Sequence, residues 1–169
     1  STSIQYGVTR DKTLQIEGVL SDGSLVCFSE ISSSVFQQKA TENSLEGTIY
    51  KTIFNELSSQ ENQQEIKNEF PKPEIHRRNT GYAVDELLTS DLFGGNEPTI
   101  NLSKLLTGSE GTLVFSTAIT IQLDVLPPAK SIMVVSHFNS INESLKATVI
   151  SMNHNLHNCE LMDKTILDC

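Results

Sequence analysis

The chain has 169 residues, of which 37% are hydrophobic, 20% are charged and 6% are aromatic, and its formal net charge is −9. This composition is typical of a folded chain, since a disordered chain carries more charge and fewer branched apolar residues. The acidic charge argues against a nucleic-acid partner, whose phosphates require a basic face, and no apolar run approaches the roughly 18 residues of a membrane span.

The three cysteines form no C-x-x-C pair, which favours a reducing compartment over a disulfide framework. Residues 1–20 carry no secretory signal, so the cytoplasm is the expected location. The chain begins at Ser1 without a Met and stops directly after the apolar residues 165–167. We therefore interpret it as a piece of a longer protein.

Residues 13–29 alternate apolar and polar side chains on both sides of Asp22–Gly23. Asp-Gly tolerates the positive φ angles of a tight primed turn, so this pattern predicts a β-hairpin. The serine-rich stretch 29–34 is expected to be a loop. One face of the hairpin is expected to collect the apolar side chains of Leu14, Ile16 and Val19 from the first strand and of Val26 and Phe28 from the second.

Apolar residues recur at three- and four-residue spacing between Leu45 and Phe70, which predicts a helix with Ser44 as its cap. A polar interval rich in Gln, Asn and Glu is expected to break or bend this helix in its second half. The prolines that follow Phe70 end it. The acidic surplus of the segment is interpreted as a solvated face.

Residues 74–88 form a basic loop that enters a predicted helix, and a second short helix is expected at 100–106. We expect the helices between 45–70 and 80–107 to cover one face of the sheet. Residues 112–125 form the clearest predicted strand of the sequence, because β-branched and apolar residues alternate with Ser and Thr.

Pro127–Pro128 breaks the chain in extended geometry and is a predicted domain boundary. Beyond it, residues 131–138 are expected to form a buried strand and residues 142–156 a helix. Residues 159–167 begin another element. This order is typical of the opening of an α/β unit.

One turn stands out between the second short helix and the clearest strand, and it reads Gly108–Ser109–Glu110–Gly111–Thr112. Two glycines three positions apart allow a tight turn with exposed N–H groups, which suits a phosphate or a heterocycle. A plain helix-to-strand turn is the alternative, and composition alone favours it. The sequence is not G-x-S-x-G, so a hydrolase nucleophile is not supported.

The stretch His76–Arg77–Arg78 concentrates positive charge in an acidic chain. Arginine can bind a carboxylate or phosphate through two parallel hydrogen bonds, and a solvated loop that offsets nearby acidic residues is an equal alternative. His154 and His157 are too few for a metal site, and a surface helix end is favoured. No acidic residue has a spacing that indicates catalysis, so no catalytic residue is assigned.

Residues 77–88 and 101–128 together resemble FAD-linked oxidoreductases of the D-lactate and D-2-hydroxyglutarate dehydrogenase type. These proteins share the vanillyl-alcohol-oxidase fold, also called the p-cresol methylhydroxylase (PCMH) fold. Their signature is a Gly-Tyr helix, a leucine-rich helix and then G-S-E-G-T-L-G before a strand. Gly81–Tyr82 and the residues from Gly108 to Leu113 match it, whereas Val114 stands where many members have a second glycine.

The N-terminal residues also resemble the family, because Tyr6–Gly7 and Asp22–Gly23 are in register with its R-Y-G and A-D-G-x-V segments. The residues after Pro128 resemble the start of the family's substrate (cap) domain. The resemblance thus spans essentially the whole chain, and its spacing and order are those of the long, iron–sulfur-fused members.

This resemblance implies an α+β fold in two parts. Residues 1–127 would be the second lobe of a PCMH-type FAD-binding domain, with a mixed or antiparallel sheet and helices on one face. Residues 128–169 would be the first strand–helix–strand of an α/β cap domain. The family's glycine-rich pyrophosphate loop is expected upstream of Ser1, and its substrate-binding arginine, histidines and any iron–sulfur cysteines downstream of Cys169.

The resemblance also implies a function for the full-length protein. It would oxidise a 2-hydroxy acid of the D-lactate, glycolate or D-2-hydroxyglutarate class by hydride transfer to FAD and pass the electrons to an acceptor, in the cytoplasm or peripheral to the inner membrane. The isolated chain is expected to be inactive, and any iron–sulfur cluster would lie outside it. A non-catalytic scaffold or interaction module derived from the fold is the alternative.

The cofactor contacts that the resemblance implies are mostly backbone N–H and C=O groups, so a valine at position 114 is tolerated if its φ stays negative. Three further residues, Arg78, Asn79 and Tyr82, would form a wall near the flavin or support the turn. The full set of expected FAD contacts is Tyr6, Gly7, Arg78, Asn79, Tyr82, Gly108, Ser109, Glu110, Gly111, Thr112, Leu113, Val114 and Phe115.

Overall fold

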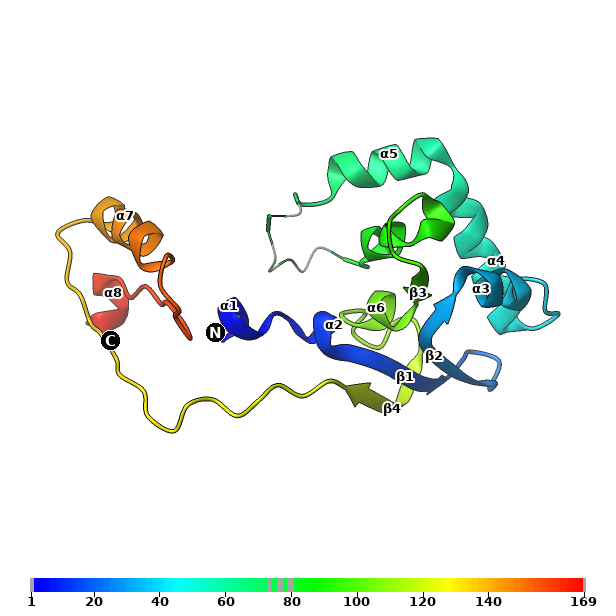
Figure 1. Cartoon of the computed structure of the whole chain (residues 1–169), viewed down its shortest axis with the longest axis horizontal. Helices are drawn as coiled ribbons and strands as arrows, with labels where there is room; N and C mark the ends of the chain where they lie inside the picture. The colour runs from blue at the N-terminus through cyan, green and yellow to red at the C-terminus, as the bar shows by residue number, and fades with distance from the viewer. Residues whose placement is uncertain (1, 73, 76–77, 79–80, 169) are drawn as a thin grey trace. The chain divides into compact units, whose positions relative to one another are not determined.

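The computed structural model describes residues 2–72, 74–75, 78 and 81–168. The chain divides into two compact units: a larger one, Thr9–Leu123, and a smaller one formed by Ser1–Val8 and Asp124–Cys169. Figure 1 shows the elements of each unit in chain order. In the described parts of the chain, no helix combines the length and the apolar character needed to cross a bilayer.

The larger unit is built on a four-stranded sheet with the order β3-β2-β1-β4, in which all neighbouring strands are antiparallel. The two predicted strand regions, 13–29 and 112–125, therefore lie in one antiparallel sheet, as expected. Its strands are β1 (Thr13–Val19), β2 (Leu25–Ser32), β3 (Thr99–Asn101) and β4 (Phe115–Ile121).

The β1–β2 hairpin is confirmed, and its inner face is largely the predicted one. Ile16 lies opposite Phe28, and both are buried together with Val26. Leu14 is 46% exposed, so its expected place in the core is wrong. Cys27 on β2 is exposed between its buried neighbours, which shows that only one face of this hairpin is covered.

The turn that joins β1 to β2 differs from the predicted primed turn. A primed turn of type I′ needs positive φ at both central residues, but in this hairpin only Gly23 has one, at 87°. The Gly23 N–H donates to the Leu20 carbonyl at 2.9 Å. Asp22 accepts hydrogen bonds from the Ser24 hydroxyl and N–H, and these bonds lower the pKa of Asp22 below its ordinary value.

The serine-rich stretch predicted as a loop instead ends β2 and begins α3 (Ser33–Lys39). Ser32 is the reason, because its hydroxyl accepts a hydrogen bond from the Val35 N–H and caps the helix. A capping serine therefore starts a helix where composition alone suggested a loop.

The long predicted helix is two helices, α4 (Leu45–Ser58) and α5 (Gln60–Glu69). Ser44 caps α4 by accepting a hydrogen bond from the Gly47 N–H, as predicted. The expected break lies at Ser59, which is extended and accepts a hydrogen bond from the Asn62 N–H. Phe70 is likewise extended, so α5 ends directly before Pro71.

Short elements replace the predicted helices between 80 and 107. They are the 3-10 helices η1 (Val84–Thr89) and η2 (Asp91–Phe93), then β3, then α6 (Ser103–Leu106). The start of the helix expected at 100–106 is thus wrong, because Thr99–Asn101 pairs with Glu30–Ser32 of β2. Backbone hydrogen bonds to the distant strand β2 thus determine the structure at 99–101, and the local helical pattern does not.

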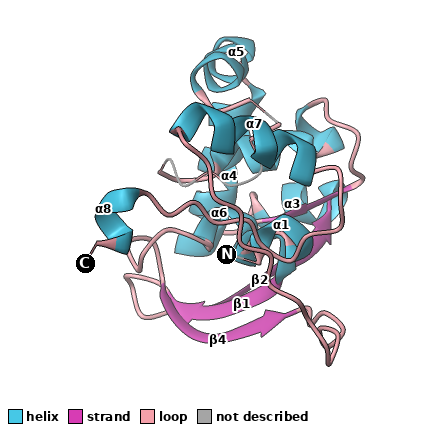
Figure 2. Ribbon diagram, turned by 90° about the vertical axis from the view of Figure 1, so that its left-hand side faces the viewer, coloured by secondary structure: helices cyan, strands magenta, loops and turns pink. Residues whose placement is uncertain are grey.

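The hydrophobic core lies between β1–β2 and the helices on one side of the sheet, as predicted. Figure 2 shows α3, α4 and α6 on the same side of the strands. Phe36 of α3 and Tyr50 of α4 are 0% and 1% exposed, and their rings meet edge to face at 4.8 Å. Burial raises the pKa of Tyr50, and the nearby carboxylate of Glu46 adds to the increase.

The smaller unit contains α1 (Ser3–Tyr6), α7 (Ile141–Ser151) and α8 (Lys164–Leu167). The helix predicted at 142–156 is confirmed as α7, in shorter form. The strands predicted before and after it are wrong: residues 131–138 are an extended segment without a ladder, and the later element is the short helix α8. A strand requires a hydrogen-bonded neighbour, and the described residues of this unit provide none.

Candidate functional site

The turn at 108–112 connects α6 to the residues that lead into β4. Three of its residues have positive φ angles: Gly108 at 93°, Glu110 at 54° and Gly111 at 74°. Glu110 is the one non-glycine residue in the described chain with such an angle, which costs about 1–2 kcal/mol relative to the right-handed region. A local conformation of this cost indicates that the surrounding contacts hold the turn in place.

Two hydrogen bonds close the turn on the carbonyl of Ser109. It accepts from the Thr112 N–H at 3.1 Å and from the Thr112 hydroxyl at 2.6 Å. The Tyr82 hydroxyl lies 2.7 Å from Thr112 Oγ1. Since the single hydroxyl proton of Thr112 is used on Ser109, Tyr82 must donate here. Tyr82 therefore anchors the turn from a distant part of the chain.

A pair of basic side chains fixes the helix that precedes the turn. Arg10 Nε donates to the Lys104 carbonyl at 3.1 Å, and Arg10 Nη2 donates to the Thr107 carbonyl at 3.0 Å. Lys104 Nζ donates in return to the Arg10 carbonyl at 2.8 Å. Arg10 ends up 8% exposed in α2 (Thr9–Lys12). No local pattern marks Arg10 for this role, because its described acceptors are backbone carbonyls more than ninety residues away.

Arg78 does not present an unpaired positive charge. Its Nη1 contacts the carboxylate of Asp85, and its Nη2 lies 2.7 Å from Glu86 Oε1. Burial lowers the pKa of Arg78, but the hydrogen bonds and charges of both carboxylates outweigh burial and raise the pKa above its ordinary value. Neither alternative for the basic stretch included this ion pair. His76, Arg77 and Asn79 lie outside the described residues.

The residues after the turn alternate between the core and the surface. Val114 is 6% exposed, whereas Leu113 and Phe115 are 40% and 73% exposed. Val114 is not among the residues with positive φ, so its conformation is one that any residue adopts. Leu113 and Phe115 thus leave an apolar surface beside the turn.

Tyr6 and Gly7 belong to the smaller unit, whereas the turn belongs to the larger one. Tyr6 ends α1, and its ring lies 6.1 Å from the ring of His157. Gly7 has φ 74°, and its N–H donates to the Ser3 carbonyl at 3.0 Å. A role for either residue at a cofactor stays a prediction.

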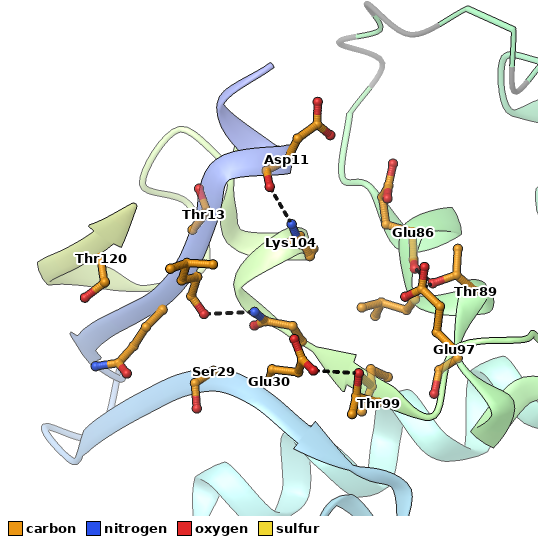
Figure 3. Close-up of a pocket in the computed structure, with 16 residues that line it drawn as sticks. Asp11, Thr13, Ser29, Glu30, Glu86, Thr89, Glu97, Thr99, Lys104 and Thr120 are labelled. Carbon is orange, nitrogen blue, oxygen red and sulfur yellow. Dashed lines mark hydrogen bonds between the residues drawn. The ribbon is translucent and has the colours of Figure 1, made fainter. Parts of the chain in front are cut away.

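A separate cavity of about 720 Å³ lies in the larger unit between β1 and η1 (Figure 3). None of its lining residues belongs to the 108–115 segment. Its walls carry hydroxyl groups and four acidic side chains against one lysine, Lys104. Such a surface repels an anionic ligand. The acidic lining residues are Asp11, Glu30, Glu86 and Glu97.

The described residues contain no group of three His, Cys, Asp or Glu side chains that could hold a metal ion. The arrangement around 108–115 is instead one of backbone donors beside exposed apolar side chains. It can bind a ligand through hydrogen bonds and contact area, but it contains no nucleophile or paired acid and base.

No family model matches the chain, and no solved structure matches it. Curated proteins match it over almost its entire length. The chain is similar to D-2-hydroxyglutarate dehydrogenases. It is 26% identical over 166 residues to the protein of this name from Escherichia coli (strain K12), 29% over 167 residues to that from Pseudomonas putida, and 25% over 171 residues to that from Haemophilus influenzae.

Each of these matches covers 98% of the chain but only 15% or 16% of the relative. The chain therefore spans about 15% of the length of the curated relatives that it matches. The similarity supports the family suggested by the sequence motifs. The PCMH fold, the iron–sulfur fusion and the cofactor contacts at 108–115 stay predictions.

Replacing Tyr82 with Phe is expected to lower the free energy of unfolding by about 1 kcal/mol, because one hydrogen bond to Thr112 is lost. Urea unfolding followed by far-ultraviolet circular dichroism measures this change. Thr112→Val is the partner variant of a double-mutant cycle. The two substitutions should be less than additive, and strict additivity would show that the two hydroxyl groups do not interact.

Proposed function

We propose that this chain is part of a flavin-dependent oxidoreductase that oxidises a 2-hydroxy acid of the D-2-hydroxyglutarate class. The observation that carries the proposal is the similarity, over 98% of the chain, to proteins named D-2-hydroxyglutarate dehydrogenase. Since the chain spans only about 15% of those proteins, we assign substrate binding and the choice of electron acceptor to polypeptide outside it.

The segment 108–115 fits a dinucleotide cofactor in three respects. The space beside Gly111 is open, because no atom lies within 4 Å of the place where its Cβ would be. Among the described residues, the N–H groups of Glu110 and Gly111 donate no backbone hydrogen bond, and both residues are exposed, so these donors are available to a ligand. Leu113 and Phe115 offer exposed apolar surface.

In this proposal the chain's own residues bind and orient the cofactor. The N–H groups of Glu110 and Gly111 donate to its phosphate or adenine acceptors, and Leu113 and Phe115 pack against its apolar parts. Tyr82 and Arg10 hold the turn in the shape that makes those donors available. When bound, FAD supplies the acceptor for the hydride that leaves the α-carbon of the substrate.

Arg78 has a supporting role in the proposal. Its guanidinium is occupied by Asp85 and Glu86, so it stabilises the segment that carries Tyr82 and does not clamp the cofactor. No residue of this chain is proposed as a ligand of an iron–sulfur cluster. The proposed donors to the cofactor are thus neutral backbone groups. Their positions depend on the backbone conformation of the turn, so the turn must keep its shape for them to bind.

The full-length protein tests this proposal. We expect it to carry stoichiometric flavin and to reduce an artificial acceptor with D-2-hydroxyglutarate at a higher kcat/KM than with D-lactate or glycolate. A flavin-free protein, or one inactive with all three acids, would contradict the proposal. Preference for D-lactate or glycolate would keep the flavoprotein assignment and correct the substrate.

A matched pair of glycine variants locates the cofactor contacts in the same protein. Gly111 and Gly94 both have positive φ, at 74° and 85°, and both have open space around the missing Cβ. Alanine therefore introduces similar backbone strain at either position. Only Gly111→Ala is expected to lower the flavin content, and an equal loss in both variants would remove the turn from the proposed site.

A further inference from the structure

Gly18 lies in the interior of β1, where a glycine normally weakens a strand because it has no side chain to pack. Its conformation does not call for glycine, since Gly18 is not among the residues with positive φ. The atoms around Gly18, in contrast, do require a glycine. A Cβ at this position would lie 2.7 Å from Val114 Cγ2 and 2.9 Å from the Phe115 carbonyl oxygen.

The space left by the absent side chain is occupied by Val114. This valine is 6% exposed and belongs to the hydrophobic core cluster. It immediately precedes β4, whose residue Ser116 pairs with Gly18 and whose residue Phe115 pairs with Val19. The register between β1 and β4 shifts between Glu17 and Gly18, so Val114 enters the core beside an irregularity in the ladder.

The two contacts of the missing Cβ differ in how they could be relieved. The valine methyl group is held by a short, β-branched side chain with few alternative rotamers. The Phe115 carbonyl belongs to the backbone of the strand and cannot move without moving the strand. A side chain at position 18 would therefore displace the backbone where the turn at 108–112 passes into β4.

We propose that Gly18 is a positioning residue: together with Val114 it forms a size-matched pair that sets the backbone path of residues 113–115. This inference rests on the proposed function, because a change in the backbone path of residues 113–115 would alter the proposed cofactor contacts of that segment. Gly18 touches no cofactor itself. It acts by leaving room for the side chain of Val114, which packs beside β1 and holds the start of β4 in place. Tyr82 holds the preceding turn through its hydrogen bond to Thr112.

The test uses three variants of the full-length protein: Gly18→Ala, Val114→Ala and the combination of both. Gly18→Ala is expected to weaken flavin binding by about tenfold or more, since overpacking displaces the strand start. Val114→Ala alone is expected to weaken flavin binding less than Gly18→Ala does, because it loosens the packing at the strand start without pushing the backbone. In the double variant the contact with Val114 Cγ2 is removed while the contact with the Phe115 carbonyl stays, so flavin affinity is expected to recover in part relative to Gly18→Ala.

Leu57→Ala is the control for a general loss of stability, because Leu57 is a buried core residue of α4 away from the turn. It should lower the unfolding midpoint but leave flavin affinity and the flavin absorption spectrum nearly unchanged. Equal flavin loss in Leu57→Ala and Gly18→Ala, or no recovery in the double variant, would overturn the inference. If Gly18→Ala does not fold, recovery of folding in the double variant supports it and failure to recover overturns it.

These outcomes are distinguishable from failure of the proposed function. A wild-type full-length protein without flavin contradicts the proposed function before any variant is compared. A wild-type protein with flavin whose affinity is insensitive to Gly18→Ala leaves the proposed function intact and overturns only the role of Gly18.

Discussion

Replacing Phe36 with Ala is expected to lower the free energy of unfolding by about 3–5 kcal/mol. Phe36 is 0% exposed, and its ring meets those of Tyr50 and Phe93 edge to face at 4.8 and 6.3 Å. The substitution removes a buried ring, leaves a cavity and breaks two aromatic contacts worth about 0.5–1.5 kcal/mol each. Urea unfolding of the chain, followed by far-ultraviolet circular dichroism, measures the change.

Val35→Ala is the matched control, since Val35 precedes Phe36 in the same helix but is 39% exposed. Its effect should stay below about 1 kcal/mol, because a partly exposed residue loses little buried area and alanine favours helix formation. Equal effects of the two substitutions would mean that α3 does not pack against the sheet through Phe36.

The parts of the fold that were predictable from the sequence are those with local causes. Asp22–Gly23 marks a hairpin because glycine supplies the positive φ next to the turn. Ser44 caps α4 through a bond to a residue three positions later. The break at Ser59 comes directly before the polar interval, where Ser59 caps the next helix by accepting a hydrogen bond from the Asn62 N–H. Each of these signals lies within a few residues of the structure that it specifies.

The predictions that were wrong concern segments whose structure depends on partners far away in the sequence. Thr99–Asn101 becomes a strand because β2 offers it a ladder, which a local helical pattern cannot reveal. Residues 131–138 have the composition of a strand, but no described strand of their unit pairs with them. Strand formation is decided by neighbours as much as by propensity, so both errors have the same origin.

The candidate site shows the same division. The glycines at 108 and 111 predicted a tight turn, and the structure has one. The left-handed conformation of Glu110 was not predicted, because non-glycine residues rarely adopt it. The hydrogen bonds of buried Arg10 were not predictable either, because their acceptors lie in a distant segment. The ion pair of Arg78 had a weak signal in the acidic residues seven and eight positions later, Asp85 and Glu86.

The chain of 169 residues, without the rest of the protein, is expected to bind FAD at least about a thousandfold more weakly than the full-length protein. The pyrophosphate of FAD is anionic, whereas the chain has a net charge of −9 and Arg78 is already paired with two carboxylates. The turn contributes neutral backbone donors. In the proposed function the pyrophosphate loop lies outside this chain, and the loss of three charge-assisted hydrogen bonds to it, at about 1.5–3 kcal/mol each, would cost about 4.5 kcal/mol or more.

The purified chain should therefore be colourless, and it should show no saturable quenching of flavin fluorescence at micromolar FAD. The turn itself should keep its shape, since the bonds of Thr112 and Tyr82 that close it lie within the chain. Gly111→Ala in the isolated chain is consequently expected to alter stability but not flavin titration. A yellow preparation with stoichiometric flavin would contradict the prediction, and it would mean that residues 108–115 provide most of the affinity through neutral backbone contacts alone.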